Sequence, residues 1–196
     1  MAAGCLQVVS AGLLLFATQM ISGCRTMKIE DFASKQPAMA PEEYFLGHTR
    51  GWGMFHDRFG NLRRQFVIDM VGEMRGDVFV LTENFVYDDG ETEQRIWHIV
   101  PLEDGAYRGT AGDVVGTAEG KAAGNAFNWV YELKLKVGDS IWKVAFDDWL
   151  FLQSDGVILN RATATRWGVE IGTLTATFHK AGPNTASIQS QAQAAE

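Results

Sequence analysis

The chain has 196 residues, which is enough for one domain with a sizeable hydrophobic core. Its formal net charge of -7 argues against nucleic acid as a partner, because binding to phosphates requires a basic surface. Local basic pairs such as Arg63–Arg64 are too small to reverse that conclusion.

Residues 1–23 carry no charged side chain and contain a short apolar run, which predicts a signal peptide rather than a membrane span. The sequence ISGC at residues 21–24 resembles a bacterial lipobox, whose cysteine is acylated. We therefore expect Cys24 to be lipidated and to anchor the protein to a membrane, with a plain cleaved signal as the alternative. In bacterial lipoproteins, an aspartate directly after the acylated cysteine retains the protein in the inner membrane. Because Arg25 occupies that position here, the resemblance implies the outer membrane, facing the periplasm. Since Cys5 would leave with the signal, we expect no disulfide.

The rest of the chain divides by composition into three segments. Residues 24–40 contain Pro, Ser and Ala without a sustained period, which predicts a lipidated tether. Residues 181–196 are polar and of low complexity, which predicts a disordered tail. The folded domain should therefore span residues 41–180, beginning with one helical turn and a glycine-punctuated aromatic segment over residues 47–55.

Alternating apolar and polar residues dominate this domain, and no helical period lasts more than one or two turns. Short segments rich in Gly, Asp and Asn separate the alternating runs, as turns do. The pattern predicts an all-β fold, an antiparallel up-and-down meander whose eight to ten strands close into a barrel and so leave no exposed edges. The predicted strands are 62–71, 78–87, 91–100, one that begins at 107, 114–122, 127–137, 141–152, 157–165 and 169–180.

The longest alternation, over residues 127–152, is interrupted only by Gly138–Asp139, which predicts a two-residue hairpin turn. Counting outward from this turn gives the pairs Val137 with Ser140, Leu135 with Trp142, Leu133 with Val144, Tyr131 with Phe146 and Trp129 with Asp148. The inward face of the hairpin is therefore apolar until Asp148.

A second register follows from residues 88–90, where Gly90 suits the left-handed position of a three-residue turn. This turn gives the pairs Tyr87 with Glu91, Phe85 with Glu93, Glu83 with Arg95 and Leu81 with Trp97. Because the other residues of that face are apolar, Glu83 and Arg95 should form an inward ion pair. Alternation along residues 62–70 likewise points Arg64 inward.

Four inward charges are the main functional candidates: Glu83, Arg95, Asp148 and Arg64. A buried charge is costly unless it is paired, so one interpretation is a salt-bridge network that fixes the strand register. The other interpretation is a cavity whose polar end binds the charged head of a ligand. The sequence leaves both open.

Other chemistry has little support in the sequence. Asp147 and Asp148 are adjacent on a strand and point to opposite faces, so they cannot chelate a metal together without a bulge. The four histidines show no metal spacing, and we predict neither a metal nor a cofactor. Glycines recur every fourth residue over residues 112–124, yet the segment lacks the P-loop pattern, and it predicts two curved strands at a barrel corner.

A family resemblance covers about residues 41–180. It is carried together by YFLGHTRGWGMFHDRFGNLRRQF, VYDDGETEQRIWHI, AGDVVGTAEGKAAGNAFNWVYEL, FDDWLFLQ and NRATATRWGVEIGTLTATFHK. This set resembles a proteobacterial lipoprotein family of unassigned function, domain of unknown function family 3833, and the resemblance implies a lipoprotein without naming an activity. A Gly-Trp segment before an antiparallel meander is also similar to lipocalin-like (calycin) barrels, which implies an internal ligand cavity.

Three functions are compatible with these features. The first is a membrane-anchored, lipocalin-like protein that binds a lipophilic small molecule or fatty acid and is not an enzyme. The second is an enzyme acting on a lipid-like substrate, with Glu83 or Asp148 as acid or base. The third is a structural envelope lipoprotein that binds a protein partner through exposed Trp149 and Trp167. For the first, the predicted ligand-binding residues are Arg64, Glu83, Arg95, Trp97, Trp129, Tyr131 and Asp148, with Phe79, Leu81, Trp142 and Phe146 as further walls.

Overall fold

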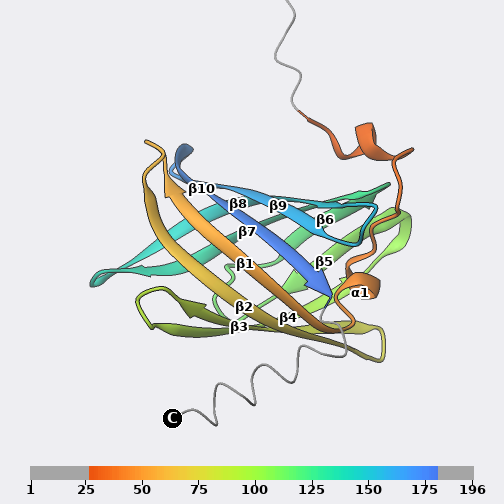
Figure 1. The fold of residues 1–196 in the computed structure, drawn as a ribbon, viewed down its shortest axis with the longest axis horizontal. Coiled ribbons are helices and arrows are strands. Elements are labelled where there is room, and N and C mark those ends of the chain that lie inside the picture. Colours follow the sequence, from red (N-terminus) through yellow and green to blue (C-terminus); the bar gives the residue numbers. More distant parts are fainter. Residues whose placement is uncertain (1–26, 181–196) are drawn as a thin grey trace, which may run out of the picture.

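The computed structural model describes residues 27–180, and in it ten antiparallel strands close into one barrel (Figure 1). Neighbours around the barrel follow the order of the chain, and β1 pairs with β10 to complete the circle. The predicted all-β meander and its closure are therefore confirmed. The elements are η1 (Ile29–Phe32), α1 (Pro41–Tyr44), β1 (Gly47–Asp57), β2 (Leu62–Arg75), β3 (Val78–Tyr87), β4 (Thr92–Pro101), η2 (Glu103–Gly105), β5 (Ala106–Thr110), β6 (Ala118–Ala123), β7 (Ala126–Val137), β8 (Ser140–Leu152), β9 (Ile158–Arg166) and β10 (Val169–Lys180).

Both predicted registers are confirmed. In the β7–β8 hairpin, Val137 lies opposite Ser140 and Trp129 lies opposite Asp148, because Gly138 adopts the positive φ that the turn requires. Across β3 and β4, Glu83 lies opposite Arg95, as counted from the turn at Gly90. Register decides which side chains point inward, so the central site follows from these two turns.

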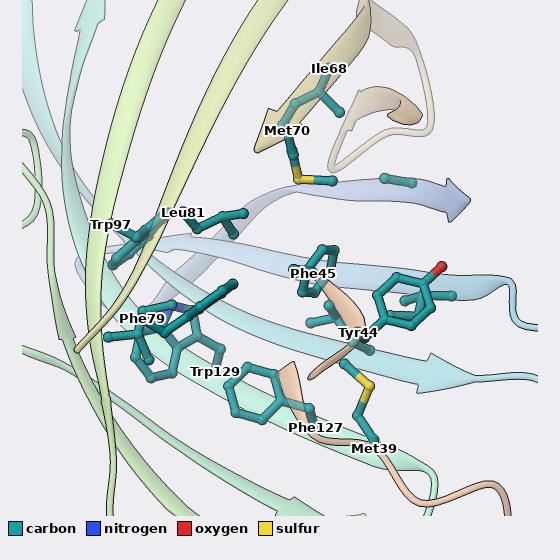
Figure 2. Packing of buried hydrophobic residues seen from close by; sticks show 14 of the residues in the cluster. Met39, Tyr44, Phe45, Ile68, Met70, Phe79, Leu81, Trp97, Phe127 and Trp129 are labelled. Atoms are coloured by element: carbon teal, nitrogen blue, oxygen red, sulfur yellow. The ribbon is translucent and has the colours of Figure 1, made fainter. Parts of the chain in front are cut away.

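One end of the barrel is closed by the segment that precedes β1. Met39, Tyr44 and Phe45 are buried there against the core, as Figure 2 shows. The single O–H of Tyr44 is shared between the backbone carbonyl oxygens of Gly156 (2.8 Å) and Phe178 (2.9 Å), which fixes α1 to the barrel. We call this the closed end and the opposite end, where the β1–β2, β3–β4, β7–β8 and β9–β10 turns lie, the mouth.

The barrel wall is incomplete near the mouth. β5 and β6 are short, so residues 92–97 of β4 and residues 131–137 of β7 pair with no strand on their facing edges. The loop 111–117 occupies this gap, where Val114 forms an isolated bridge with Leu133. Its backbone also bonds to β7 through Asp113 and Val115.

Two predicted segments differ from the structure. Residues 47–55 were expected to precede the first strand but form most of β1, whose inward glycines leave room for neighbouring rings; a Cβ on Gly53 would lie 2.2 Å from Phe66. Residues 114–122 were expected to be one strand, but β6 begins only at Ala118. Residues 114–117 form a loop instead, where Val114 and Val115 bond to β7. The glycines of this stretch leave no alternation of apolar side chains from which the start of β6 could be predicted.

The N-terminal part of the described chain packs on the barrel. Phe32, within the segment predicted as a tether, contacts the rings of Trp149 and Phe151. No helix among residues 27–180 is long and apolar enough to cross a membrane. The predicted signal peptide, Cys24 and the predicted tail over residues 181–196 lie outside the described residues.

Candidate functional site

The interior of the barrel holds two adjoining cavities. The outer cavity has a volume of about 920 Å³ and begins at the mouth, whereas the inner chamber measures about 140 Å³ and reaches toward α1. Residues from five strands line both cavities and so form the boundary between them: Phe66, Phe85, Arg95, Tyr131 and Leu174.

The outer cavity has two unlike walls. Its apolar wall comes from β7, β8, β9 and β10, where alternation places large aliphatic and aromatic side chains inward. Its polar wall comes from β2, the β3–β4 turn, β4 and the loop 111–117. The apolar wall includes Leu133, Leu135, Val144, Phe146, Ile171 and Leu174, and the polar wall includes Arg64, Glu91, Glu93, Arg95 and Asp113.

Arg95 is the centre of the boundary, and its side chain is only 11% exposed. Carboxylates from three directions surround it: Asp113 at 2.8 Å, Glu93 at 3.2 Å and Glu83 at 3.7 Å. Burial by itself would lower the pKa of Arg95, but the negative charges of Glu83 and Asp113 outweigh it and raise that pKa. The guanidinium therefore already contacts carboxylates through all three of its nitrogens.

Glu83 lies on the inner-chamber side of Arg95. The indole Nε1 of Trp97 donates to its carboxylate at 3.3 Å. Burial raises the pKa of Glu83 to about 7, although Arg95 and the indole both favour the charged form. Glu83 can therefore change protonation state near neutral pH.

Asp148 is the second carboxylate of the inner chamber and is 9% exposed. The hydroxyl of Tyr131 donates to one of its oxygens at 2.6 Å, and the side-chain amide of Asn160 lies 3.4 Å from the other. Burial raises the pKa of Asp148 to about 6, since these hydrogen bonds offset only part of the loss of water. The pKa of Tyr131 is also raised, first by burial and then by the charge of Asp148.

Aromatic rings make up much of the inner chamber. Trp97 meets Trp129 edge to face at 5.6 Å between ring centroids and meets Tyr131 at 5.3 Å. Phe127 stacks on Trp129 (Figure 2). These interlocking rings fix the positions of both carboxylates, because Trp97 and Tyr131 also bind them.

Arg64 is the predicted site residue that the structure separates from the others. It lies at the mouth, where its guanidinium covers the ring of Tyr87 at 3.4 Å and bonds to Asp89 and Glu91. Trp142, predicted as part of the aromatic wall, lines neither cavity and is covered by Arg166. The six remaining predicted binding residues, Glu83, Arg95, Trp97, Trp129, Tyr131 and Asp148, all line the inner chamber.

Three site residues were missed at the sequence level: Glu93, Asp113 and Asn160. The register already opposed Glu93 to the inward Phe85, and alternation with buried Ile158 and Ala162 could have placed Asn160 inside. Asp113 had no such signal, because it lies in a loop rather than a strand.

The two tryptophans predicted to be exposed, Trp149 and Trp167, do not form one patch. Trp149 is half-buried against Phe32, whereas Trp167 is 86% exposed in the turn between β9 and β10. Trp149 lies opposite Arg161, and Trp167 lies six residues further along the chain, which is roughly 20 Å along an extended strand. No cluster of three or more His, Cys, Asp or Glu suited to a metal occurs within residues 27–180.

Comparison with known proteins identifies a family and a fold. A family model described as protein of unknown function, DUF3833, matches residues 18–180. The barrel is similar to the S-type phycobiliprotein lyase CPES from Guillardia theta, with a TM-score of 0.54, 11% identity, and coverage of 81% of this chain and 100% of the lyase. It is also similar to a protein of unknown function from the DUF3598 family of Nostoc punctiforme, with a TM-score of 0.52, 10% identity, and coverage of 75% and 51%. No curated protein matches the sequence significantly.

Proposed function

The chain belongs to the DUF3833 family of proteins of unknown function, and we propose that it binds a lipophilic small molecule inside its barrel. The observation that carries this proposal is the outer cavity, which is open at the mouth while α1 plugs the opposite end. Its volume of about 920 Å³ is that of a small-molecule site. A plugged barrel with one open mouth admits a ligand without letting it pass through.

The unlike walls suit an amphipathic ligand. An aliphatic tail would pack against Leu133, Phe146 and Leu174, which exclude water from that side. The polar part of the ligand would then face β4 and the loop 111–117. The fatty acid predicted from the sequence has this shape, and Arg95 or Arg64 was the predicted partner for its carboxylate.

Binding is tested by native mass spectrometry of delipidated, refolded protein with fatty acids and fatty alcohols of increasing chain length. We expect a saturable complex with one ligand per chain. Leu135→Glu would place a charge on the half-buried part of the apolar wall and should weaken binding about tenfold or more. Val130→Glu adds the same charge to the outer face of β7 and serves as the control. The absence of any saturable complex would refute the proposal.

We further propose that acylation of Cys24 anchors the protein to the outer membrane, facing the periplasm. The ISGC sequence at residues 21–24, preceded by an uncharged apolar run, supports this. Labelling cells with a clickable fatty acid should mark the wild type, and Cys24→Ser should lose the mark. Equal labelling of both proteins would contradict acylation at this cysteine.

An enzyme is the second candidate, and the raised pKa values of Glu83 and Asp148 favour it, because such groups cluster in active sites. Both carboxylates line the same chamber, so one could act as acid and the other as base. Turnover of a lipid-like ester that is lost in Glu83→Gln and Asp148→Asn would support this function. Turnover that persists in both variants would rule out these residues as the acid and base.

A further inference from the structure

Asp148 is a buried carboxylate that forms no ion pair with any residue between 27 and 180. Its two hydrogen-bond donors are the neutral side chains of Tyr131 and Asn160. No Lys or Arg of the described chain forms an ion pair with it. The charge of Arg95 lowers the pKa of Asp148 in part, but its guanidinium contacts three other carboxylates. A buried carboxylate without an ion pair carries a large desolvation cost, which a bound cation would offset.

The region around the boundary has an excess of negative charge. Three carboxylates, those of Glu83, Glu93 and Asp113, contact the guanidinium of Arg95, and Asp148 also lines the inner chamber. A fatty-acid carboxylate reaching this boundary would have to displace one of them and would be repelled by the rest. The boundary therefore disfavours an anionic head group and favours a cationic one.

The inner chamber has the composition of a cation site. Its walls include the rings of Phe79, Trp97, Phe127, Trp129 and Tyr131, whose π-electrons attract organic cations. Two carboxylates, Glu83 and Asp148, lie among these rings. The volume of about 140 Å³ admits a head group of only a few heavy atoms.

From this geometry we propose that the inner chamber binds a small organic cation, the ammonium head of an alkylamine-like ligand, with Asp148 as its main counter-ion and Glu83 as the second. This inference rests on the proposed function, because the alkyl chain of the same ligand passes the boundary at Phe66 and Leu174 and lies in the outer cavity. Alkylamines are protonated at neutral pH, as lysine is. The ligand class thus differs from the fatty acid that the sequence suggested.

The test compares three probes with the same chain, dodecylammonium, dodecanol and dodecanoate, on the full-length protein. Native mass spectrometry counts bound probes, and a change in tryptophan fluorescence, to which Trp97 and Trp129 of the chamber contribute, accompanies occupancy of the chamber. We expect dodecylammonium to bind about tenfold or more tightly than dodecanoate, with dodecanol between them. Asp148→Asn should weaken binding of the amine about tenfold and leave binding of the alcohol nearly unchanged.

Asp147→Asn is the matched control. It removes the same charge from the neighbouring position on β8, where the side chain faces outward and bonds to Asn128. Amine binding that falls equally in both variants would show attraction to the acidic protein in general and would overturn the inference. A preference for dodecanoate would also overturn it while leaving the proposed function intact. Failure of all three probes to bind would refute the proposed function as well.

Discussion

Replacing Asp148 by asparagine should stabilise the protein at neutral and alkaline pH. Burial raises the pKa of Asp148 from 3.8 to about 6, so the folded state binds this proton more tightly than the unfolded state. Its contribution to stability is therefore full below a pH of about 4, falls as pH rises through about 6, and is lost above that. Asparagine fills nearly the same space without the charge and escapes this loss.

The magnitude follows from the size of the pKa shift. A rise of about 2 units corresponds to roughly 3 kcal/mol of unfolding free energy, at about 1.4 kcal/mol per unit. The amide can still accept the hydrogen bond from Tyr131, but its NH₂ group would face the NH₂ of Asn160 and cost about 1 kcal/mol. The expected net gain at a pH of about 8 is about 2 kcal/mol, or a rise in Tm of about 4–8 °C.

Urea and thermal unfolding followed by circular dichroism would measure this gain at a pH of about 8 and again at about 4.5. The gain should shrink or disappear at the lower pH, where Asp148 is largely protonated in the wild type. Asp147→Asn, on the solvent-facing side of β8, should change the unfolding free energy by less than about 0.5 kcal/mol at both values. An Asp148→Asn variant that is less stable at the higher pH, or equally stabilised at both, would refute the reasoning.

Three further predictions concern the closed end and the loop at the mouth. Gly72→Ala should lower the unfolding free energy by about 2 kcal/mol or more, because its Cβ would lie 2.2 Å from the carbonyl oxygen of Phe45; Gly112→Ala, with no neighbour within 4 Å, should not. Tyr44→Phe should cost about 1–3 kcal/mol in urea unfolding, since the O–H that two backbone carbonyls share is lost. Asp113→Asn should weaken the ion pair that holds the loop 111–117, so amide hydrogen exchange there should accelerate while exchange in β8 stays unchanged. Stability or exchange that matches the wild type would contradict the corresponding contact.

The registers at the two hairpins could be predicted because turn chemistry and alternation give the same answer. Gly138 and Gly90 fix the turns, and counting outward from them placed Glu83 opposite Arg95 and Trp129 opposite Asp148. Strand pairing in a meander is local in sequence, so most of the barrel follows from such counts. This is why six of the predicted binding residues line one chamber.

Contacts between distant segments could not be predicted in this way. Asp113 reaches Arg95 because the loop 111–117 fills the gap between β4 and β7. The alternation of apolar and polar residues does not predict that gap. Met39 and Phe45 pack into the closed end from a segment without strand alternation. The position of Arg64 could not be predicted either. Alternation predicts that its side chain points inward, but not how far along the barrel axis it lies.

The two interpretations of the inward charges can now be separated by their energetics. Arg95 with Glu83, Glu93 and Asp113 forms a self-contained network that links β3, β4 and the loop, so fixing these segments accounts for it. Asp148 lies outside that network of ion pairs, and a buried charge without a counter-ion lowers stability where an apolar side chain of similar size would raise it. Scaffold stability therefore explains the arginine network but not Asp148. A ligand that brings its own positive charge supplies the missing counter-ion, and Asp148 is then the interior residue whose substitution should most clearly separate ligand binding from folding.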